Sequence, residues 1–160
     1  MPRNSRTSDS ISRPFKHVEK RLAGPRLPKT TDFDSERMGR VRREGTQPEA
    51  IVRRTAWRLG LRLRRPARRL PGSPDLANLG RGLAVFIHGC FWHGHRGCVR
   101  ATVPKRNRPF WIAKFERNRA RDRKVVRELR DLGFRVVTIW ECEAEDMKKL
   151  TRQLLGVTSS

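Results

Sequence analysis

The chain has 160 residues, and its 38 Lys and Arg against 16 Asp and Glu give a formal net charge of +22. This length suits one domain with a modest core. The sequence contains no run of about 18 apolar residues of the kind that would indicate a membrane span. So large a positive charge favours a polyanionic partner. Nucleic acid fits better than a membrane, because the basic segments lack a large apolar opposite face.

The charge is concentrated in two stretches of the chain. Residues 37–69 hold twelve Arg and two Glu, and residues 96–130 hold thirteen basic and three acidic residues. Residues 70–95, between them, hold one Arg, one Asp and three of the four His. A bias in genome composition toward arginine codons would raise the arginine content along the whole chain, including residues 70–95. The pattern therefore predicts a charged groove with chemistry at its centre.

Three regions are expected along the chain. Residues 1–35 are rich in Ser, Arg, Pro and Thr and show no sustained hydrophobic period, which predicts a flexible basic arm. Residues 36–156 have the pattern of a folded domain, and residues 157–160 form a short tail.

The domain is expected to open with a helix and a strand. Thr46, Pro48 and Glu49 have the spacing of a capping box, which predicts a helix over residues 46–59 that stops at a glycine. Residues 61–65 alternate apolar and basic side chains, which is typical of an edge or half-exposed strand.

The remaining elements alternate between strands and helices. We expect a short strand from Asp75, central strands at 83–87 and 134–140, and helices at 109–132 and 144–155. The fold class is therefore mixed α/β, with one small sheet flanked by helices.

Four side chains have the chemistry of a closed zinc site: Cys90, His95, Cys98 and Cys142. An odd number of cysteines argues against a disulfide framework. If the two central strands pair side by side, Cys142 returns to the Cys90 loop. The alternative is three ordinary buried thiols with His95 at the surface.

Two further histidines, His88 and His93, lie in the same loop. A metal-bound loop that presents two imidazoles would suit general acid–base catalysis. The alternatives are that one of them replaces a cysteine as ligand, or that both only support the metal ligands.

The motifs resemble one family, the very short patch repair (Vsr) DNA mismatch endonucleases. The most specific match is the HGCFWH string from His88 to His93. The resemblance spans roughly residues 36–145. Its other matching segments are Met38, 46–49, 71–75, Trp111, Asn118, Arg121-Asp122 and 140–142.

The resemblance implies a variant of the restriction-endonuclease-like fold that elsewhere carries a Pro-Asp…Asp/Glu-x-Lys signature. Here Pro74-Asp75 is present, and residues 86–88 take the place of the second motif. In the family, the aspartate at Asp75 binds catalytic magnesium together with the backbone carbonyl at Ile87. The zinc set would be structural.

The resemblance also implies a catalytic set. We interpret His93 as the general base on water and Asp122 as the carboxylate that fixes its tautomer. His88 would contact the phosphate or its water, and Glu49 would orient metal-bound water. The alternatives are a surface ion pair for Asp122 and helix capping for Glu49.

The resemblance further implies aromatic wedges that open the base stack beside a T:G mispair. Core packing is the alternative for such residues, and it is the reading we adopt for Trp57 and Trp140. The expected DNA-contacting residues are Phe91, Trp92 and Trp111, with Met38 approaching from the opposite groove.

The implied function is nicking of double-stranded DNA beside a T:G mismatch that arises from 5-methylcytosine deamination. The enzyme would act as a cytoplasmic monomer, with a functional link to a cytosine-5 DNA methyltransferase and other mismatch-repair proteins. Two alternatives stay open: a related nuclease without mismatch preference, and a non-catalytic zinc DNA-binding module.

Overall fold

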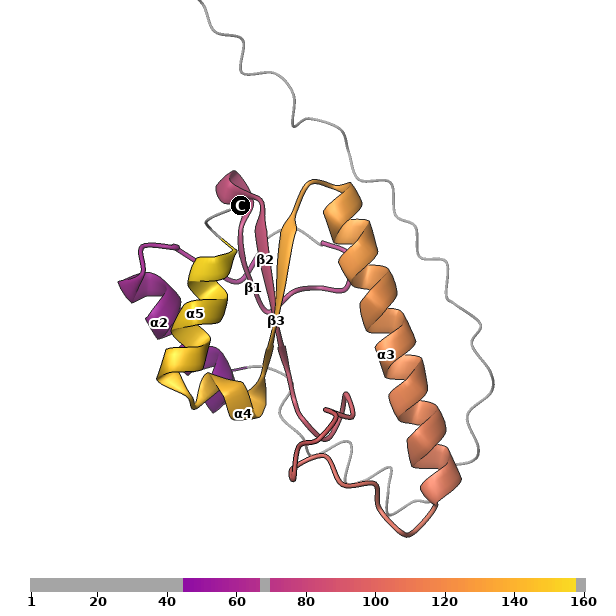
Figure 1. Ribbon diagram of the computed structural model, residues 1–160. Coiled ribbons are helices and arrows are strands. Elements are labelled where there is room, and N and C mark those ends of the chain that lie inside the picture. Colours follow the sequence, from indigo (N-terminus) through magenta and orange to yellow (C-terminus); the bar gives the residue numbers. More distant parts are fainter. Residues whose placement is uncertain (1–44, 67–69, 158–160) are drawn as a thin grey trace, which may run out of the picture.

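The computed structural model describes residues 45–66 and 70–157, in which one sheet lies between two layers of helices (Figure 1). Helix α3 covers one face of the sheet, and α2, α4 and α5 cover the other. No helix in these ranges has the length and apolar character needed to cross a membrane. The elements, in chain order, are α2 (Gln47–Arg58), β1 (Leu76–Asn78), the 3-10 turn η1 (Leu79–Arg81), β2 (Leu83–His88), α3 (Arg108–Asp131), β3 (Arg135–Trp140), α4 (Glu141–Ala144) and α5 (Met147–Gly156). The predicted small mixed sheet flanked by helices is confirmed.

The sheet has the strand order β1-β2-β3, with β1 antiparallel and β3 parallel to β2. The pairing runs from Leu83 opposite Arg135 to His88 opposite Trp140. Parallel strands present their carboxyl ends at the same edge of a sheet. The segments that follow β2 and β3 therefore meet, as the sequence predicted, and Cys142 comes back to the Cys90 loop.

The continuous apolar run of β2 is buried because helices cover both faces of the sheet. Leu83 and Val85 pack in the core with α2 and α5, whereas Ala84 and Phe86 pack in the core beneath α3. Since side chains alternate along a strand, His88 follows Phe86 onto the α3 face. The strand period thus aims this histidine at the long basic helix.

Helix α2 ends as the sequence predicted but begins differently. At its end, Gly60 has a φ of +70° and the Leu61 amide donates to the Ala56 carbonyl at 2.9 Å, which is a Schellman motif. At its start, Thr46 makes no side-chain capping bond. Glu49 accepts a hydrogen bond from the amide of Gly45 at 3.0 Å rather than from that of Thr46, so the predicted capping box is replaced by a bond to the preceding residue.

Two expected elements differ in extent. Residues 61–65 keep their alternation of buried and exposed side chains, but only Arg64 pairs with the sheet, through an isolated bridge to Ala77. The expected strand is wrong because β1 has three residues and offers little edge to extend it. The closing helix is two helices, α4 and α5, separated where the Asp146 side chain caps α5.

The turn before β1 depends on a glycine. Gly72 has a φ of +68°, and a Cβ added there would clash with the Val125 side chain of α3. The backbone of this turn therefore packs directly against α3. That close approach holds Asp75 beside the end of β2.

Candidate functional site

A cavity of about 540 Å³ lies between the end of β2 and the middle of α3. Of the residues that the sequence singled out, this cavity brings together Asp75, Ile87, His88, Trp92, His93 and Asp122. They come from β2, the loop after it, α3 and the residue before β1. We call this cavity the catalytic pocket, after the roles that the sequence predicted for these residues.

His93 and Asp122 form the shortest polar contact of the pocket. The His93 Nδ1 and Asp122 Oδ2 atoms are 2.6 Å apart. Burial is the largest influence on the Asp122 carboxyl and opposes ionisation, but the His93 hydrogen bond and neighbouring positive charge outweigh it, and its pKa is lowered. Arg121 lies 3.4 Å from the other carboxylate oxygen, so the alternative of an ion pair is also realised.

His88 stacks on His93 with ring centroids 3.8 Å apart and planes at 11°. Burial, and then the neighbouring His93, lower the pKa of His88 to about 4, although Asp122 opposes this. At neutral pH His88 is therefore an uncharged imidazole. It can exchange hydrogen bonds with an anion but does not contribute positive charge.

Asp75 is fixed against the backbone of β2. Its Oδ2 atom accepts a hydrogen bond from the Ile87 amide at 2.7 Å. Burial raises the pKa of Asp75, and the nearby negative charge of Glu49 raises it further. Two carboxylates in this setting would be stabilised by a hard cation with oxygen ligands, so the residues fit a divalent metal.

Three polar residues of α3 also line the pocket: Lys114, Asn118 and Arg121. Asn118 donates to the Trp92 carbonyl at 2.7 Å, which ties the loop to α3. The sequence reasoning gave none of them a role. Their spacing of three and four residues on a helix that also carries Asp122 was the signal that could have found them.

The aromatic side chains after β2 form one cluster with the start of α3. Phe91 and Trp92 are half-buried and meet edge to face, with centroids 5.0 Å apart. Trp111 lies beneath them and is only 2% exposed. Trp92 lines the catalytic pocket and Phe91 is partly buried beside it, whereas Trp111 packs in the core. Met38 lies outside the described residues.

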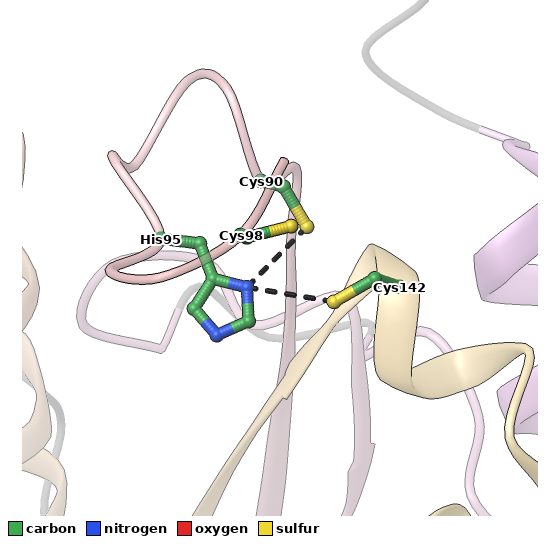
Figure 2. A group of neighbouring side chains, drawn as sticks. All are labelled: Cys90, His95, Cys98 and Cys142. Carbon is green, nitrogen blue, oxygen red and sulfur yellow. Dashed lines mark hydrogen bonds between the residues drawn. The ribbon is translucent and has the colours of Figure 1, made fainter. Parts of the chain in front are cut away.

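The second cluster is formed by Cys90, His95, Cys98 and Cys142, which point toward one another (Figure 2). Their four donor atoms all lie within 4.8 Å of one another. Gly97 has a φ of +72°, which lets the loop between His95 and Cys98 close. All four predicted ligands thus come together and could hold a metal ion.

The thiols of this cluster respond strongly to their surroundings. Burial, and then the other two thiols, raise the pKa of Cys142 to about 12, and burial also raises that of Cys90. A hydrogen bond from the backbone amide of Arg100 lowers the pKa of Cys98. Cys90 and Cys142 therefore resist ionisation, and a bound metal cation would reverse this tendency.

The two tryptophans that we expected in the core behave differently. Trp140 is partly buried; its ring stacks on His95 at 4.1 Å and meets His88 edge-on at 5.5 Å, so it joins the two clusters. Trp57 is 52% exposed, and the core prediction is wrong for it. The apolar stripe of α2 that faces the core contains Val52 and Ala56, and Trp57 points away from it.

Comparison with known proteins gives consistent similarities. The family described as DNA mismatch endonuclease Vsr matches residues 29–100. The type II nicking enzyme V.XorIIP of Xanthomonas oryzae pv. oryzae is 41% identical over 120 residues, which cover 75% of this chain and 88% of that protein. V.NmeAIP of Neisseria meningitidis, also a type II nicking enzyme, is 39% identical over 79% of this chain and 89% of its own. The DNA mismatch endonuclease Vsr of Escherichia coli is 38% identical over 72% of this chain and 75% of its own.

Proposed function

Since the chain belongs to the Vsr family of DNA mismatch endonucleases, and is therefore a DNA endonuclease, we propose that it nicks duplex DNA beside a T:G mispair by magnesium-dependent hydrolysis. The observation that carries the proposal is the catalytic pocket, where His93 and Asp122 are 2.6 Å apart beside Asp75 and His88. The mispair would arise from deamination of 5-methylcytosine. A cytosine-5 DNA methyltransferase is the expected functional partner.

His93 serves as the general base in this mechanism. The Asp122 carboxylate is ionised and can only accept a hydrogen bond, so Nδ1 of His93 carries the ring proton. The Nε2 atom is then left with its lone pair and removes a proton from the attacking water. Asp122 also stabilises the imidazolium that this proton transfer creates.

The scissile phosphate is held by positive and neutral donors. Arg121 and Lys114 bring positive charge from α3 to the pocket. His88 is neutral at physiological pH and binds the phosphate or its water by hydrogen bonding rather than by charge. This division keeps one imidazole available as a base while its stacked neighbour orients the substrate.

Magnesium would be held by Asp75 together with the backbone carbonyl of Ile87, and Glu49 would orient water bound to the ion. A magnesium ion there would polarise the phosphate and stabilise charge on the leaving oxygen. The raised pKa of Asp75 supports this assignment, because the buried carboxylate lies near a second negative charge, that of Glu49.

The mispair is selected by aromatic wedges. Phe91 and Trp92 are partly buried and would enter the base stack, with the buried Trp111 in contact with both rings. Opening a base step costs a few kcal/mol, and a mispaired step is already weakened. Met38 is expected to approach from the opposite groove.

The Cys90 cluster binds structural zinc in this proposal. Zinc–sulfur and zinc–nitrogen bonds of about 2.3 and 2.0–2.1 Å at a tetrahedral angle place sulfur and nitrogen about 3.6 Å apart. The His95 Nδ1 atom lies 3.6 Å from Cys90 Sγ and 3.5 Å from Cys142 Sγ. We expect one zinc per chain by elemental analysis, lost with the folded state in Cys142→Ser; a protein without zinc would contradict the assignment.

The function is tested by nicking assays on matched T:G, T:A and C:G duplexes, with and without magnesium. Nicking of the T:G duplex alone, and only when magnesium is present, supports the proposal. His93→Ala should abolish nicking while binding changes only a few-fold, and Arg152→Ala, on the surface of α5, serves as the control. Wild-type nicking by His93→Ala would overturn the general-base assignment.

A nuclease without mismatch preference is the second candidate, and equal cleavage of all three duplexes would favour it. A non-catalytic zinc module fits poorly, because binding alone needs neither the His93–Asp122 pair nor the buried Asp75.

A further inference from the structure

A second basic cavity, of about 560 Å³, lies along the exposed side of α2 and the segment that follows it. We call it the α2 groove. Among the described residues that line it none is acidic. Its polar and aromatic lining consists of Arg53, Arg54, Trp57, Arg58, Arg64 and Arg65.

Trp57 is the aromatic side chain of this groove, and it is 52% exposed. The guanidinium carbon of Arg62 lies 4.1 Å from the centroid of its ring. Arg62 has a φ of +50°, a left-handed conformation that arginine seldom adopts, between the buried Leu61 and Leu63. The backbone therefore holds a cation against a solvent-facing indole.

The α2 groove is linked to the catalytic pocket by charges that act on Asp75. The charge of Arg65, which lines the groove, acts on the Asp75 carboxyl, and so does the charge of Glu49, the residue before Ala50 in α2. Arg64 is fixed to β1 by two backbone hydrogen bonds with Ala77, two residues beyond Asp75. Arg64 and Arg65 therefore carry positive charge of the α2 groove toward the segment that contains Asp75.

We propose that the α2 groove binds single-stranded DNA, with a base stacked on Trp57 and adjacent phosphates on Arg53 and Arg64. A duplex backbone needs the arginines but not an exposed indole, whereas single-strand sites combine a positive groove with an aromatic platform. The proposed function enters only as the source of the strand, because nicking releases a strand end next to Asp75.

The test is binding of short fluorescein-labelled oligo(dT) and of an equally long blunt dA:dT duplex, measured by anisotropy without magnesium. Trp57→Ala should weaken oligo(dT) binding by about tenfold or more, and Trp57→Phe, which keeps a ring, by less than about threefold. Trp57→Phe should also lose part of the tryptophan quenching that oligo(dT) causes in the wild type. Unchanged oligo(dT) affinity in Trp57→Ala would overturn the proposal.

The contribution of charge is tested with the double variant Arg53→Ala/Arg64→Ala. The control is the double variant Lys148→Ala/Arg152→Ala, which removes an equal charge from the surface of α5. The first pair should lower both oligo(dT) affinity and its salt dependence, and the second should change them little. Equal loss of duplex and oligo(dT) affinity in Trp57→Ala would contradict a single-strand site and indicate a duplex-backbone surface. Thermal melting shows that each variant is folded. Since the assay measures binding without cleavage, its outcome is independent of whether the chain nicks T:G duplexes.

Discussion

Replacement of Asp122 by Asn isolates the contribution of charge to the catalytic pair. Asn has nearly the same shape, so the stacked His88 and His93 rings keep their neighbours. What changes is the negative charge 2.6 Å from His93 Nδ1. An amide can also donate to Nδ1, which would favour the tautomer that lacks a basic Nε2.

The magnitude follows from the position of the pair. Opposite charges about 4 Å apart at an effective dielectric constant of about 20 interact by about 4 kcal/mol. The His93 and Asp122 side chains are 17% and 19% exposed, so solvent reduces this value somewhat. A loss of about 2–4 kcal/mol of transition-state stabilisation corresponds to nicking slower by about 30- to 1000-fold.

The assay is single-turnover nicking of a T:G duplex with saturating enzyme and magnesium. Asp131→Asn removes the same charge from the exposed end of α3 and serves as the matched control. DNA affinity of the two variants should be similar, because the effect belongs to the chemical step. If Asp122→Asn nicks within about threefold of Asp131→Asn, the assignment of His93 as an oriented general base is wrong.

Three further predictions concern the stability of the pocket. Gly72→Ala should lower the free energy of unfolding in urea by about 1–3 kcal/mol, because the added methyl group meets Val125 and the φ of Gly72 is +68°. Adding Val125→Ala to this variant should recover part of the loss. An unchanged urea midpoint in Gly72→Ala would contradict the close packing of this turn against α3. The pKa of His88 is 6.5 in the unfolded chain and about 4 in the folded protein, so the unfolded state binds a proton more readily between these values. The free energy of unfolding of the wild type should therefore fall by on the order of 3 kcal/mol as the pH drops from 6.5 to 4. The His88→Gln variant should lose less free energy of unfolding over the same pH range. Parallel curves of unfolding free energy against pH for the variant and the wild type would refute this. The pKa of Asp75 is raised above 3.8, so its ionised form destabilises the folded state at pH 7. Without magnesium, the Asp75→Asn variant should therefore melt at a higher temperature than the wild type at pH 7. This difference in melting temperature should disappear as the pH falls toward 3.8.

The strand period and the spacing of rare residue types carried most of the sequence prediction. The apolar run before His88 predicted a strand buried on both faces, and its parallel pairing with β3 brought Cys142 back to Cys90. Both results follow from properties that are local in sequence. A strand alternates its side chains, and parallel neighbours end at one edge.

The parts that the sequence did not predict depend on contacts between distant segments. The burial of Trp111 depends on how the loop after β2 folds onto α3, and the exposure of Trp57 depends on which stripe of α2 meets the sheet. Residues 61–65 had the alternation of a strand but found only a three-residue partner. Hydrophobicity indicates that a residue can be buried, not which surface will bury it.

Basic residues of the described chain line a cavity on each side of the sheet. The second basic stretch forms much of α3, whose Lys114 and Arg121 line the catalytic pocket on one side of the sheet. The first stretch continues into α2, which lies in the opposite helix layer and lines the α2 groove (Figure 1). If both proposals hold, the α3 side would bind duplex at the site of cleavage, and the α2 groove, whose Arg65 acts electrostatically on Asp75, would bind the single strand.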